Sequence, residues 1–310
     1  MSAETVVVLN PESGSGSHSA TVRQRADELG YTLVATDTDG DAVALAAAAA
    51  RRGVDTLVAA GGDGTVNEVI RGIGRADAFD RVTLGVVPVG TGNNFAKQLG
   101  IVGPDAAFDV VESGERRRLD LGRANGHLFV NSCIAGLTAD SSSRTSPAMK
   151  QRLGVLAYVV TTLRTVSDFE SLRLTVAIDG RDRSEPAWTG DALGVLIGNA
   201  RQFGPAKHGP ADAEDGLFDV AVIEDVPVLS LMSDAVVERL LGRNSTYITR
   251  FQAGSLSVEV HNPSSVRFSL DGEIIQERRL SFESLPRTLS VAVGEQYESA
   301  PRRDFDRTDF

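Results

Sequence analysis

The stretch Gly61-Gly62-Asp63-Gly64-Thr65 separates an apolar run at residues 54–60 from an amphipathic segment that begins at Val66. This pattern predicts a strand, a glycine turn and a helix that ends near Gly72 and Gly74. Three glycines in four positions allow positive φ and leave no Cβ to block a close approach. The turn leads into a helix N-terminus, where unpaired N–H groups and the helix dipole favour an anion. We therefore expect a phosphate site, and a turn that only connects strand and helix is the alternative.

The composition limits the class of protein. The chain has 310 residues, enough for two domains, with 42% hydrophobic and 24% charged residues, as in soluble globular proteins. A net charge of −11 without a basic stripe argues against nucleic-acid binding. The single cysteine, Cys133, excludes an internal disulfide. With only four histidines besides it, the chain has few residues that could form a Cys/His zinc site. The sequence has no signal-peptide pattern and no run that could span a bilayer, so we expect a cytoplasmic protein.

Strands and helices alternate in the first part of the chain. Apolar strands are predicted at residues 5–9, 31–36, 54–60 and 82–87. Helices are predicted after each strand, at residues 20–29, 42–50, 66–74, 95–99 and 104–111. In the second of these helices, Asp41 is the expected N-cap and Gly53 the residue that ends it. The alternation predicts a parallel sheet with helices on both faces, and ligands outside the carboxyl ends of its strands.

Three polar loops follow strands of this predicted sheet. They lie at residues 10–16, 61–65 and 90–94. Because the carboxyl ends of parallel strands meet at one edge, we expect the loops to converge on one crevice. Neither the Rossmann fingerprint nor the P-loop string is present, since the first loop lacks a third glycine and no G-x-x-x-x-G-K-[ST] occurs.

The second part of the chain predicts mostly antiparallel strands. Short strands are expected at residues 119–122, 127–132, 171–178, 193–197, 218–223, 255–260, 266–270, 280–283 and 289–293. The first two flank Asn125-Gly126, which is a strong hairpin signal. Helices are expected at residues 147–167 and 226–241. The pattern predicts a sandwich or a partly closed barrel with helices attached.

Two loops in this part carry carboxylates. Residues 209–219 contain four acids within eight positions, which indicates either a solvated turn or an oxygen site for a hard cation. The acid spacing is not that of an EF-hand. The other loop, Asp271-Gly272-Glu273, follows a strand and is on its own a hairpin turn.

Taken together, these strings resemble the diacylglycerol kinase catalytic-domain family, the lipid kinases that include the sphingosine and ceramide kinases. The matching strings, in family order, are Asn10-Pro11-x-Ser13-Gly14, Gly61-Gly62-Asp63-Gly64-Thr65 with Asn67-Glu68, Gly90-Thr91-Gly92-Asn93 with Phe95-Ala96, Asp215-Gly216-Leu217 and Asp271-Gly272-Glu273. The resemblance implies an α/β nucleotide-binding domain of the NAD kinase and phosphofructokinase type, with a parallel sheet, at residues 1–118. It implies a β-sandwich-like second domain at residues 119–284, with residues 285–310 packing back on the first.

The resemblance also implies the site residues. The nucleotide-binding positions are Asn10, Pro11, Glu12, Ser13, Gly14, Thr36, Gly61, Gly62, Asp63, Gly64, Thr65, Val66, Asn67 and Thr91. Glu273 or Asp271 is implied as the catalytic base, and the choice between them stays open. Asp215, with the backbone near Asp212 and Leu217, matches a structural Mg²⁺ site. Asp120 is implied in the network that ties this ion to the site.

Two departures from the family pattern concern charge. Asn94 replaces an aspartate that is common after the Gly90 string, which removes one negative charge. No lysine follows Gly14, so Arg23, Arg25 or Lys97 would have to supply a cation. Asp63 is expected to orient the phosphates or the metal of the nucleotide and not to accept the proton.

The implied activity is an ATP- and Mg²⁺-dependent kinase that phosphorylates the hydroxyl of a lipid alcohol such as diacylglycerol. Phosphoryl transfer depends mainly on positioning and on neutralising the γ-phosphate, to which such loops are suited. The alternatives are an NAD-kinase-like enzyme, a soluble polyol kinase, and an inactive nucleotide- or lipid-binding protein. Peripheral contact with the inner face of the membrane and a homodimer also stay open.

Overall fold

The computed structural model describes residues 4–15, 18–38, 40–136, 171–179, 186–200, 212–225 and 247–299. The chain divides into two compact units, one formed by Met1–Leu121 with Leu285–Ser299, the other containing Gly122–Ser284. Two strands, β5 (Glu115–Ala124) and β15 (Arg279–Val293), carry the chain from one unit to the other. The helices expected at residues 147–167 and 226–241, and residues 300–310 of the C-terminal segment, lie outside the described residues.

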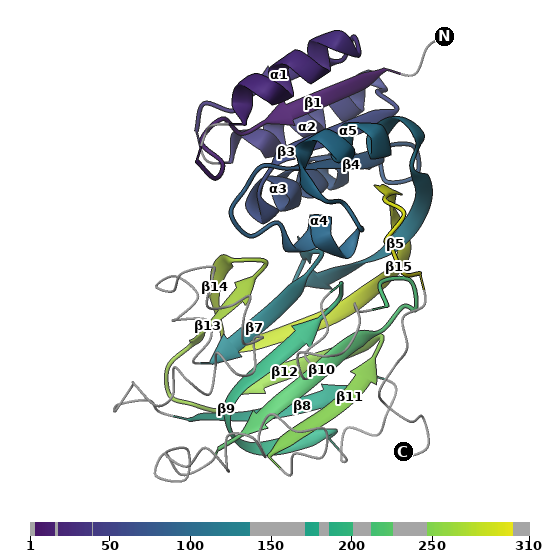
Figure 1. Cartoon of the computed structure of the whole chain (residues 1–310). Coiled ribbons are helices and arrows are strands. Elements are labelled where there is room, and N and C mark those ends of the chain that lie inside the picture. Colours follow the sequence, from purple (N-terminus) through teal and green to yellow (C-terminus); the bar gives the residue numbers. More distant parts are fainter. Residues whose placement is uncertain are drawn as a thin grey trace, which may run out of the picture. The chain divides into compact units, whose positions relative to one another are not determined.

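The first unit is an α/β layer structure (Figure 1). Its elements are β1 (Thr5–Leu9), α1 (Ser19–Glu28), β2 (Thr32–Ala35), α2 (Asp41–Arg52), β3 (Thr56–Gly61), α3 (Asp63–Arg75), β4 (Thr83–Pro88), α4 (Asn94–Gln98) and α5 (Gly103–Ser113). The strand order is β2-β1-β3-β4, all pairs are parallel, and the end of β15 is parallel to β4 through Ser290 and Val291. Continuous apolar strands suit this position because a parallel sheet is covered on both faces. The expected parallel sheet with helices is therefore present.

Asp41 differs from its expected role as N-cap. The N-cap of α2 is Gly40, in the left-handed conformation with φ 88°, and Asp41 is the first helical residue. Its carboxylate reaches back and accepts hydrogen bonds from the N–H groups of Thr38 (2.7 Å) and Asp37 (3.0 Å). The bonds from Thr38 and Asp37 lower the pKa of Asp41. The acid thus fastens the loop before the helix.

α3 ends at Arg75, one residue after Gly74, which agrees with the predicted end near Gly72 and Gly74. Gly72 itself lies inside the helix. A Cβ at Gly72 would lie 2.6 Å from the Cβ of Ala46 and 2.7 Å from the carbonyl oxygen of Val43, both on α2. Glycine is present at position 72 because α2 and α3 pack closely, and not because the helix ends there.

The second unit is built from antiparallel strands. They are β6 (His127–Phe129), β7 (Ser132–Gly136), β8 (Leu172–Ile178), β9 (Trp188–Gly198), β10 (Phe218–Glu224), β11 (Ile248–Ala253), β12 (Ser255–Val260), β13 (Val266–Leu270) and β14 (Glu273–Glu277), with the adjoining parts of β5 and β15. One edge of β9 pairs with β10, and its other edge pairs first with β8 and then with β7. β9 thus joins the ladder β14-β13-β7 to the ladder β8-β12-β15. The strands β11 and β14 were not predicted, and the two strands expected at residues 280–293 form one continuous strand.

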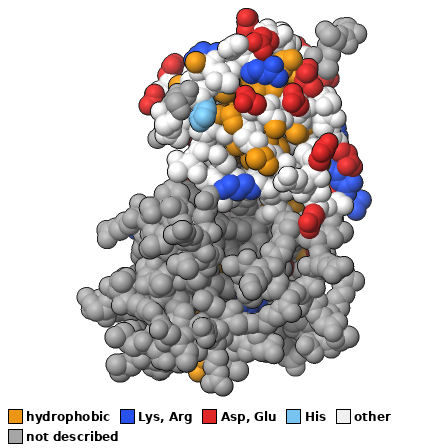
Figure 2. Space-filling view, in the orientation of Figure 1, with side chains coloured by type: hydrophobic (Ala, Val, Ile, Leu, Met, Phe, Trp, Pro, Cys, Tyr) orange, Lys and Arg blue, Asp and Glu red, His pale blue; other side chains and the backbone are white. Residues whose placement is uncertain are grey.

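Aromatic side chains fill the core of the second unit. Phe129, Phe218 and Phe282 are at most 1% exposed, and their ring centroids lie 5.8 to 6.4 Å apart. One pair is stacked and the other two are edge to face, which are favourable arrangements for aromatic rings. By contrast, Figure 2 shows acidic and basic side chains interspersed over the visible face of the first unit.

The role of Gly72 gives a prediction. We expect Gly72→Ala to lower the free energy of unfolding by about 1–3 kcal/mol, because the added methyl group overlaps α2. Gly64→Ala in the same helix is the matched control, since a Cβ there has no atom within 4 Å. Its stability should be unchanged or higher by up to ~1 kcal/mol. Urea unfolding measures both, and equal stabilities of the two variants would contradict the packing argument.

Candidate functional site

The three polar loops of the first unit meet at the carboxyl ends of β1, β3 and β4. A Cβ at Gly14, in the first loop, would lie 2.5 Å from the carbonyl oxygen of Val89, which directly precedes the third. A Cβ at Gly90 would overlap the Cα of Gly62, in the second loop. The backbones of all three loops are therefore in direct contact. The expected convergence is observed in the first unit.

Asn10 ties the first loop to the second. Its Oδ1 accepts a hydrogen bond from the N–H of Glu12 (3.0 Å), and its carbonyl oxygen accepts one from the N–H of Ser13 (3.2 Å). Its Nδ2 donates to Oγ1 of Thr65 (3.3 Å), which is 5% exposed. The side chains of Asn10 and Thr65 thus hold the loops together, and Glu12 stays exposed.

The glycines of the second loop act through space and not through unusual dihedral angles. None of Gly61, Gly62 and Gly64 has positive φ, so the positive φ that glycine allows is not used at these positions. A Cβ at Gly61 would overlap the side chain of Thr65, and one at Gly62 would lie 3.4 Å from Gly90. Gly64 has no such neighbour, although glycine is unfavourable in a helix. Packing within the described protein therefore explains Gly61, whereas a Cβ at Gly62 would make only an ordinary contact and one at Gly64 none.

The N-terminus of α3 has no side-chain cap, because its N-cap is Gly62. The first helical bond runs from the N–H of Val66 to the carbonyl of Gly62, and Gly64 in the first turn is exposed. The start of a helix therefore lies beside the other two loops. Such a terminus attracts an anion through its N–H groups and the helix dipole.

Asp63 connects the second loop to the third. Its Oδ2 accepts hydrogen bonds from the backbone N–H (3.0 Å) and from Nδ2 (3.1 Å) of Asn94, and its Oδ1 accepts one from the N–H of Phe95 (2.9 Å). The carboxylate thus caps α4. An aspartate at position 94 would place a second carboxylate where Nδ2 now donates. Asn94 therefore matches Asp63, although no sequence signal pairs these two residues.

The third loop is held by an asparagine that was not predicted as a site residue. Asn93 is left-handed, with φ 51°; its Oδ1 accepts from the N–H of Gly90 (3.1 Å), and its Nδ2 donates to the carbonyl of Gly90 (2.6 Å). Nζ of Lys97 donates to the carbonyl of Gly92 (2.8 Å). This turn leaves the predicted residue Thr91 exposed at its tip.

Of the three candidate cations, Lys97 alone has an observed contact with a loop. Arg25 pairs with Glu28 (3.1 Å) and Asp109 (3.5 Å) and lies over the ring of Phe108, which directs it to α5. Arg23 is exposed on α1. Lys97 is therefore the cation that the structure places at the loops.

The remaining predicted nucleotide-binding residues differ in exposure. Pro11 and Ser13 are half-buried in the first loop, whereas Thr36 is 8% exposed at the end of β2. Val66 and Asn67 are 2% and 6% exposed on the inner side of α3. These last two side chains support the helix from inside.

In the second unit, Asp271 and Glu273 have different surroundings. The turn at Asp271 and Gly272, with φ of 48° and 102°, joins β13 to β14. Oδ2 of Asp271 accepts from the N–H of Val130 (2.7 Å), and its Oδ1 accepts from those of Asn131 (3.0 Å) and Ser132 (2.8 Å). Glu273 is exposed at the start of β14. Asp271 is thus held by the backbone, and Glu273 is accessible.

Cys133 lies beneath this turn and pairs with Leu270 in the sheet. It is fully buried, and burial, with a further contribution from the charge of Asp271, raises the pKa of its thiol well above the ordinary value. A neutral buried thiol is inert. Cys133 is therefore a core residue.

The predicted metal loop contains two carboxylates in tight turns. Oδ1 of Asp212 accepts from the N–H of Glu214 (3.1 Å), Oδ1 of Asp215 accepts from that of Leu217 (2.8 Å), and Gly216 has φ 75°. Within the described ranges, no cluster of three or more acidic, histidine or cysteine side chains could hold a metal ion. Mg²⁺ is commonly held by one or two carboxylates and keeps several waters, so the Mg²⁺ site at this loop stays a prediction.

Asp120 has an observed role in the first unit. It is 1% exposed on β5, and its Oδ1 accepts a hydrogen bond from the N–H of Arg287 (2.7 Å) on β15. Arg287 has φ 48°. This contact fixes an irregular point of β15.

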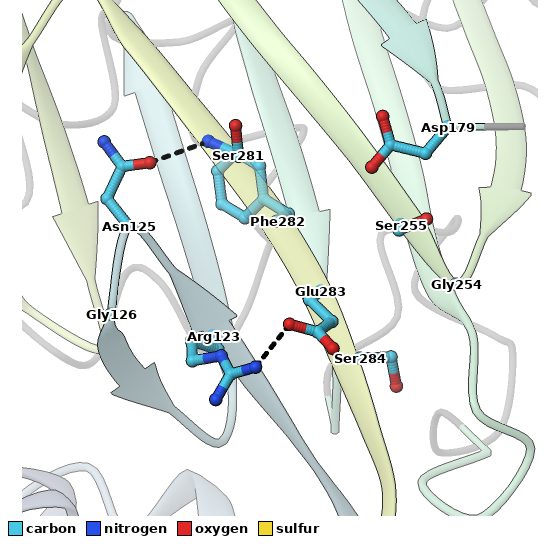
Figure 3. Close-up of a pocket in the computed structure, with 10 residues that line it drawn as sticks. All are labelled: Arg123, Asn125, Gly126, Asp179, Gly254, Ser255, Ser281, Phe282, Glu283 and Ser284. Carbon is cyan, nitrogen blue, oxygen red and sulfur yellow. Dashed lines mark hydrogen bonds and ion pairs between the residues drawn. The ribbon is translucent and has the colours of Figure 1, made fainter.

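A polar pocket of about 590 Å³ lies on the second unit (Figure 3). Among its lining residues, Arg123 pairs with Glu283, and Oδ1 of Asn125 accepts from the N–H of Ser281 (3.0 Å). Asp179 and Ser255 lie on the opposite side. None of the predicted site residues lines this pocket.

Among the helices that the structure describes, none has the length and the apolar character needed to cross a bilayer.

Comparison with known proteins identifies both parts of the chain. The model of the diacylglycerol kinase catalytic domain matches residues 4–124. The model of the YegS C-terminal NAD kinase beta sandwich-like domain matches residues 131–293. Together with the strand order, these matches confirm the expected fold class, an α/β domain with a parallel sheet followed by a β-rich domain.

Similar proteins extend over nearly the whole chain. A diacylglycerol kinase from Bacillus subtilis is 32% identical over 278 residues, which cover 86% of this chain and 88% of the relative. A "probable lipid kinase YegS-like" protein from Pseudomonas aeruginosa is 33% identical over 276 residues, with 88% and 87% covered. A crystal structure of a diacylglycerol kinase from Bacillus anthracis has the same fold, with a TM-score of 0.71 at 20% identity, and covers 95% of this chain and 98% of its own.

The contacts of Asp63 give a second prediction. We expect Asp63→Ala to lower the free energy of unfolding by about 1–3 kcal/mol, because three N–H donors at the start of α4 lose their acceptor. Asp27→Ala, which removes the same charge from an exposed position of α1, is the control and should change stability by less than about 0.5 kcal/mol. Urea unfolding compares them. A loss no larger than that of the control would contradict the capping role.

Proposed function

Because this chain belongs to the family of diacylglycerol kinases and YegS-like lipid kinases, we propose that it transfers the γ-phosphate of ATP to the hydroxyl of a lipid alcohol such as diacylglycerol. The observation that carries the proposal is the contact of three loop backbones beside the uncapped N-terminus of α3. The site offers backbone N–H groups, and these suit the phosphates of a nucleotide.

The first unit is assigned to ATP. The N–H groups at the start of α3 would bind the phosphates, and the open space at Gly64 lets them approach the backbone. Lys97 adds a positive charge at the third loop. Asp63 would act on ATP indirectly, since both of its carboxylate oxygens accept hydrogen bonds from Asn94 and Phe95. Its role is to position the second and third loops.

The second unit is assigned the proton acceptor, and the surroundings favour Glu273 over Asp271. Three backbone N–H groups occupy the carboxylate of Asp271, whereas that of Glu273 is exposed. In the reaction, Glu273 would accept the proton of the lipid hydroxyl. The oxygen of that hydroxyl would form a bond to the γ-phosphorus, and ADP would leave. A positioned base typically contributes 10²–10⁴-fold. Asp271 would hold the turn that presents Glu273.

Mg²⁺ is assigned to the loop that carries Asp212 and Asp215. These two carboxylates and the backbone at Leu217 would hold the ion. When bound, Mg²⁺ neutralises the carboxylates of the loop and orders it.

A labelled transfer assay tests the function. The protein is incubated with ATP labelled at the γ-phosphate and, in separate reactions, with diacylglycerol, a sphingoid base, NAD and glycerol. We expect label in a lipid product. Label only in NAD or only in glycerol would identify one of the alternative kinases, and ATP binding without transfer to any acceptor would identify a sensor.

One experiment should distinguish the roles of the two carboxylates in the turn. Glu273→Gln should lower the rate of transfer by about 10²-fold or more with unchanged stability, since the side chain is exposed. Asp271→Ala should lower the free energy of unfolding by about 1–3 kcal/mol, because three N–H groups lose their acceptor. Glu277→Gln, at the other end of β14, is the control for Glu273. Near-normal transfer by Glu273→Gln would refute its role.

Gly64 tests the phosphate site separately. Gly64→Ala should weaken ATP binding at least about tenfold, because its Cβ would occupy the space through which the phosphates approach. Adenosine, which has no phosphate, is the control ligand and should bind the variant as it binds the wild type. Isothermal titration measures both, and unchanged ATP affinity would place the phosphates elsewhere.

A further inference from the structure

Asn199 is a buried asparagine to which the proposed reaction gives no role. It directly follows β9 and is 2% exposed. Its backbone N–H donates a hydrogen bond to the carbonyl oxygen of Asn131 (2.8 Å), and its Nδ2 donates one to the carbonyl oxygen of Val130 (2.9 Å). The N–H of Ala200 donates to the same oxygen of Val130 (3.0 Å). The end of β9 therefore holds two consecutive carbonyl groups of a segment that is distant in sequence.

This segment, Val130–Ser132, lies between Asn199 and the turn that carries Asp271. Ser132 begins β7, which pairs with β9 on one edge and with β13 on the other (Figure 1). All three residues of the segment are buried, and their N–H groups donate to the carboxylate of Asp271. The N–H of Asp271 in turn donates to the carbonyl oxygen of Ser132 (3.0 Å). The segment is thus held by Asn199 on one side and by Asp271 on the other.

Two peptide groups connect Asn199 with the carboxylate of Asp271. The first joins Val130 to Asn131. Its carbonyl accepts from Nδ2 of Asn199, and its N–H donates to Oδ1 of Asp271 (3.0 Å). The second joins Asn131 to Ser132; its carbonyl accepts from the N–H of Asn199, and its N–H donates to the same Oδ1 (2.8 Å). Because hydrogen bonds in a chain polarise one another, the bonds from Asn199 strengthen those that hold Asp271.

The amide side chain suits position 199 because it donates a hydrogen bond and carries no charge. Aspartate would have nearly the same shape, but its carboxylate would face the carbonyl oxygen of Val130 without a proton to donate. Alanine would remove one of the two observed hydrogen bonds to that oxygen and leave space beside it. In either variant the segment could shift, and Asp271 would shift with it.

We propose that Asn199 is a positioning residue for phosphoryl transfer: through residues 130–132 it fixes Asp271, and thereby the direction in which the turn presents Glu273. The inference rests on the proposed function, in which Glu273 accepts the proton. Asn199 itself needs no contact with a substrate. A misplacement of about 1 Å can lower a rate about 10²-fold, so a residue that acts only through the backbone can still affect transfer.

Steady-state transfer by Asn199→Ala is the first test. We expect kcat to fall about tenfold or more while KM for ATP changes less than about twofold, because the base loses its position and the loops of the first unit do not change. Asn262→Ala is the matched control. Nδ2 of Asn262 donates to the carbonyl oxygen of Ser171 (3.1 Å), and its Oδ1 accepts from the N–H of Arg173 (2.8 Å), so it holds a backbone segment at β8. An equal fall of kcat in both variants would overturn the proposal.

A double variant distinguishes positioning from a general effect on the fold. If Asn199 acts through Glu273, the variant with both Asn199→Ala and Glu273→Gln should transfer phosphate at the rate of Glu273→Gln alone. A further loss of about tenfold in the double variant would show that Asn199 acts elsewhere and would overturn the proposal. Asn199→Ser, which removes less volume and keeps a hydroxyl group, takes the place of Asn199→Ala if that variant does not fold.

Hydrogen exchange tests the link to Asp271 without the reaction. In Asn199→Ala, the N–H groups of residues 130–132 should exchange about tenfold faster than in the wild type, and Asn262→Ala should leave their exchange unchanged. Mass spectrometry of peptides that span this segment measures the exchange. Unchanged exchange in Asn199→Ala with an active wild type would overturn the role of Asn199 and keep the kinase assignment. Faster exchange with an inactive wild type would overturn the kinase assignment and keep the link between Asn199 and Asp271.

Discussion

The close approach of the Gly62 and Gly90 backbones is the constraint on which the first unit's site depends. A Cβ at Gly90 would lie 2.3 Å from the Cα of Gly62, and one at Gly14 would lie 2.5 Å from the carbonyl oxygen of Val89. Such contacts bring backbone N–H groups of different loops to one place. Side chains at the contact positions would keep the loops apart. The parallel sheet makes this possible because β1, β3 and β4 end at the same edge. The glycines therefore contribute to the site because they have no side chain.

Carboxylates in this protein divide into those that fasten the backbone and those that remain accessible. Asp63 and Asp271 each accept three hydrogen bonds, and each holds a segment distant in sequence. Glu273 is two residues from Asp271 and is exposed. A motif that contains two acids can thus combine an anchor with a reactive group. The side chain of Asn94 donates a hydrogen bond to the carboxylate of Asp63. An asparagine in place of an aspartate can thus fit the hydrogen bonds of a loop.

Local pattern predicted much of the fold and the positions of the loops. The strands of the parallel sheet and the three loops follow from apolar runs that end in glycine and polar residues. The partners of Asp63 and Asp271 could not be predicted, because they lie 31 and about 140 positions away. β14 was missed because its sequence, Glu273–Glu277, is half polar and exposed, and the reason for Gly72 lies on another helix.

A crystal structure with Mg²⁺ and a non-hydrolysable ATP analogue would locate the nucleotide. We expect triphosphate oxygens within hydrogen-bond distance, about 2.7–3.2 Å, of backbone nitrogens at the start of α3, with the third loop beside them. The side chain of Asp63 should keep its contacts with Asn94 and Phe95 in that complex. A triphosphate bound away from all three loops would refute the assignment of the phosphate site.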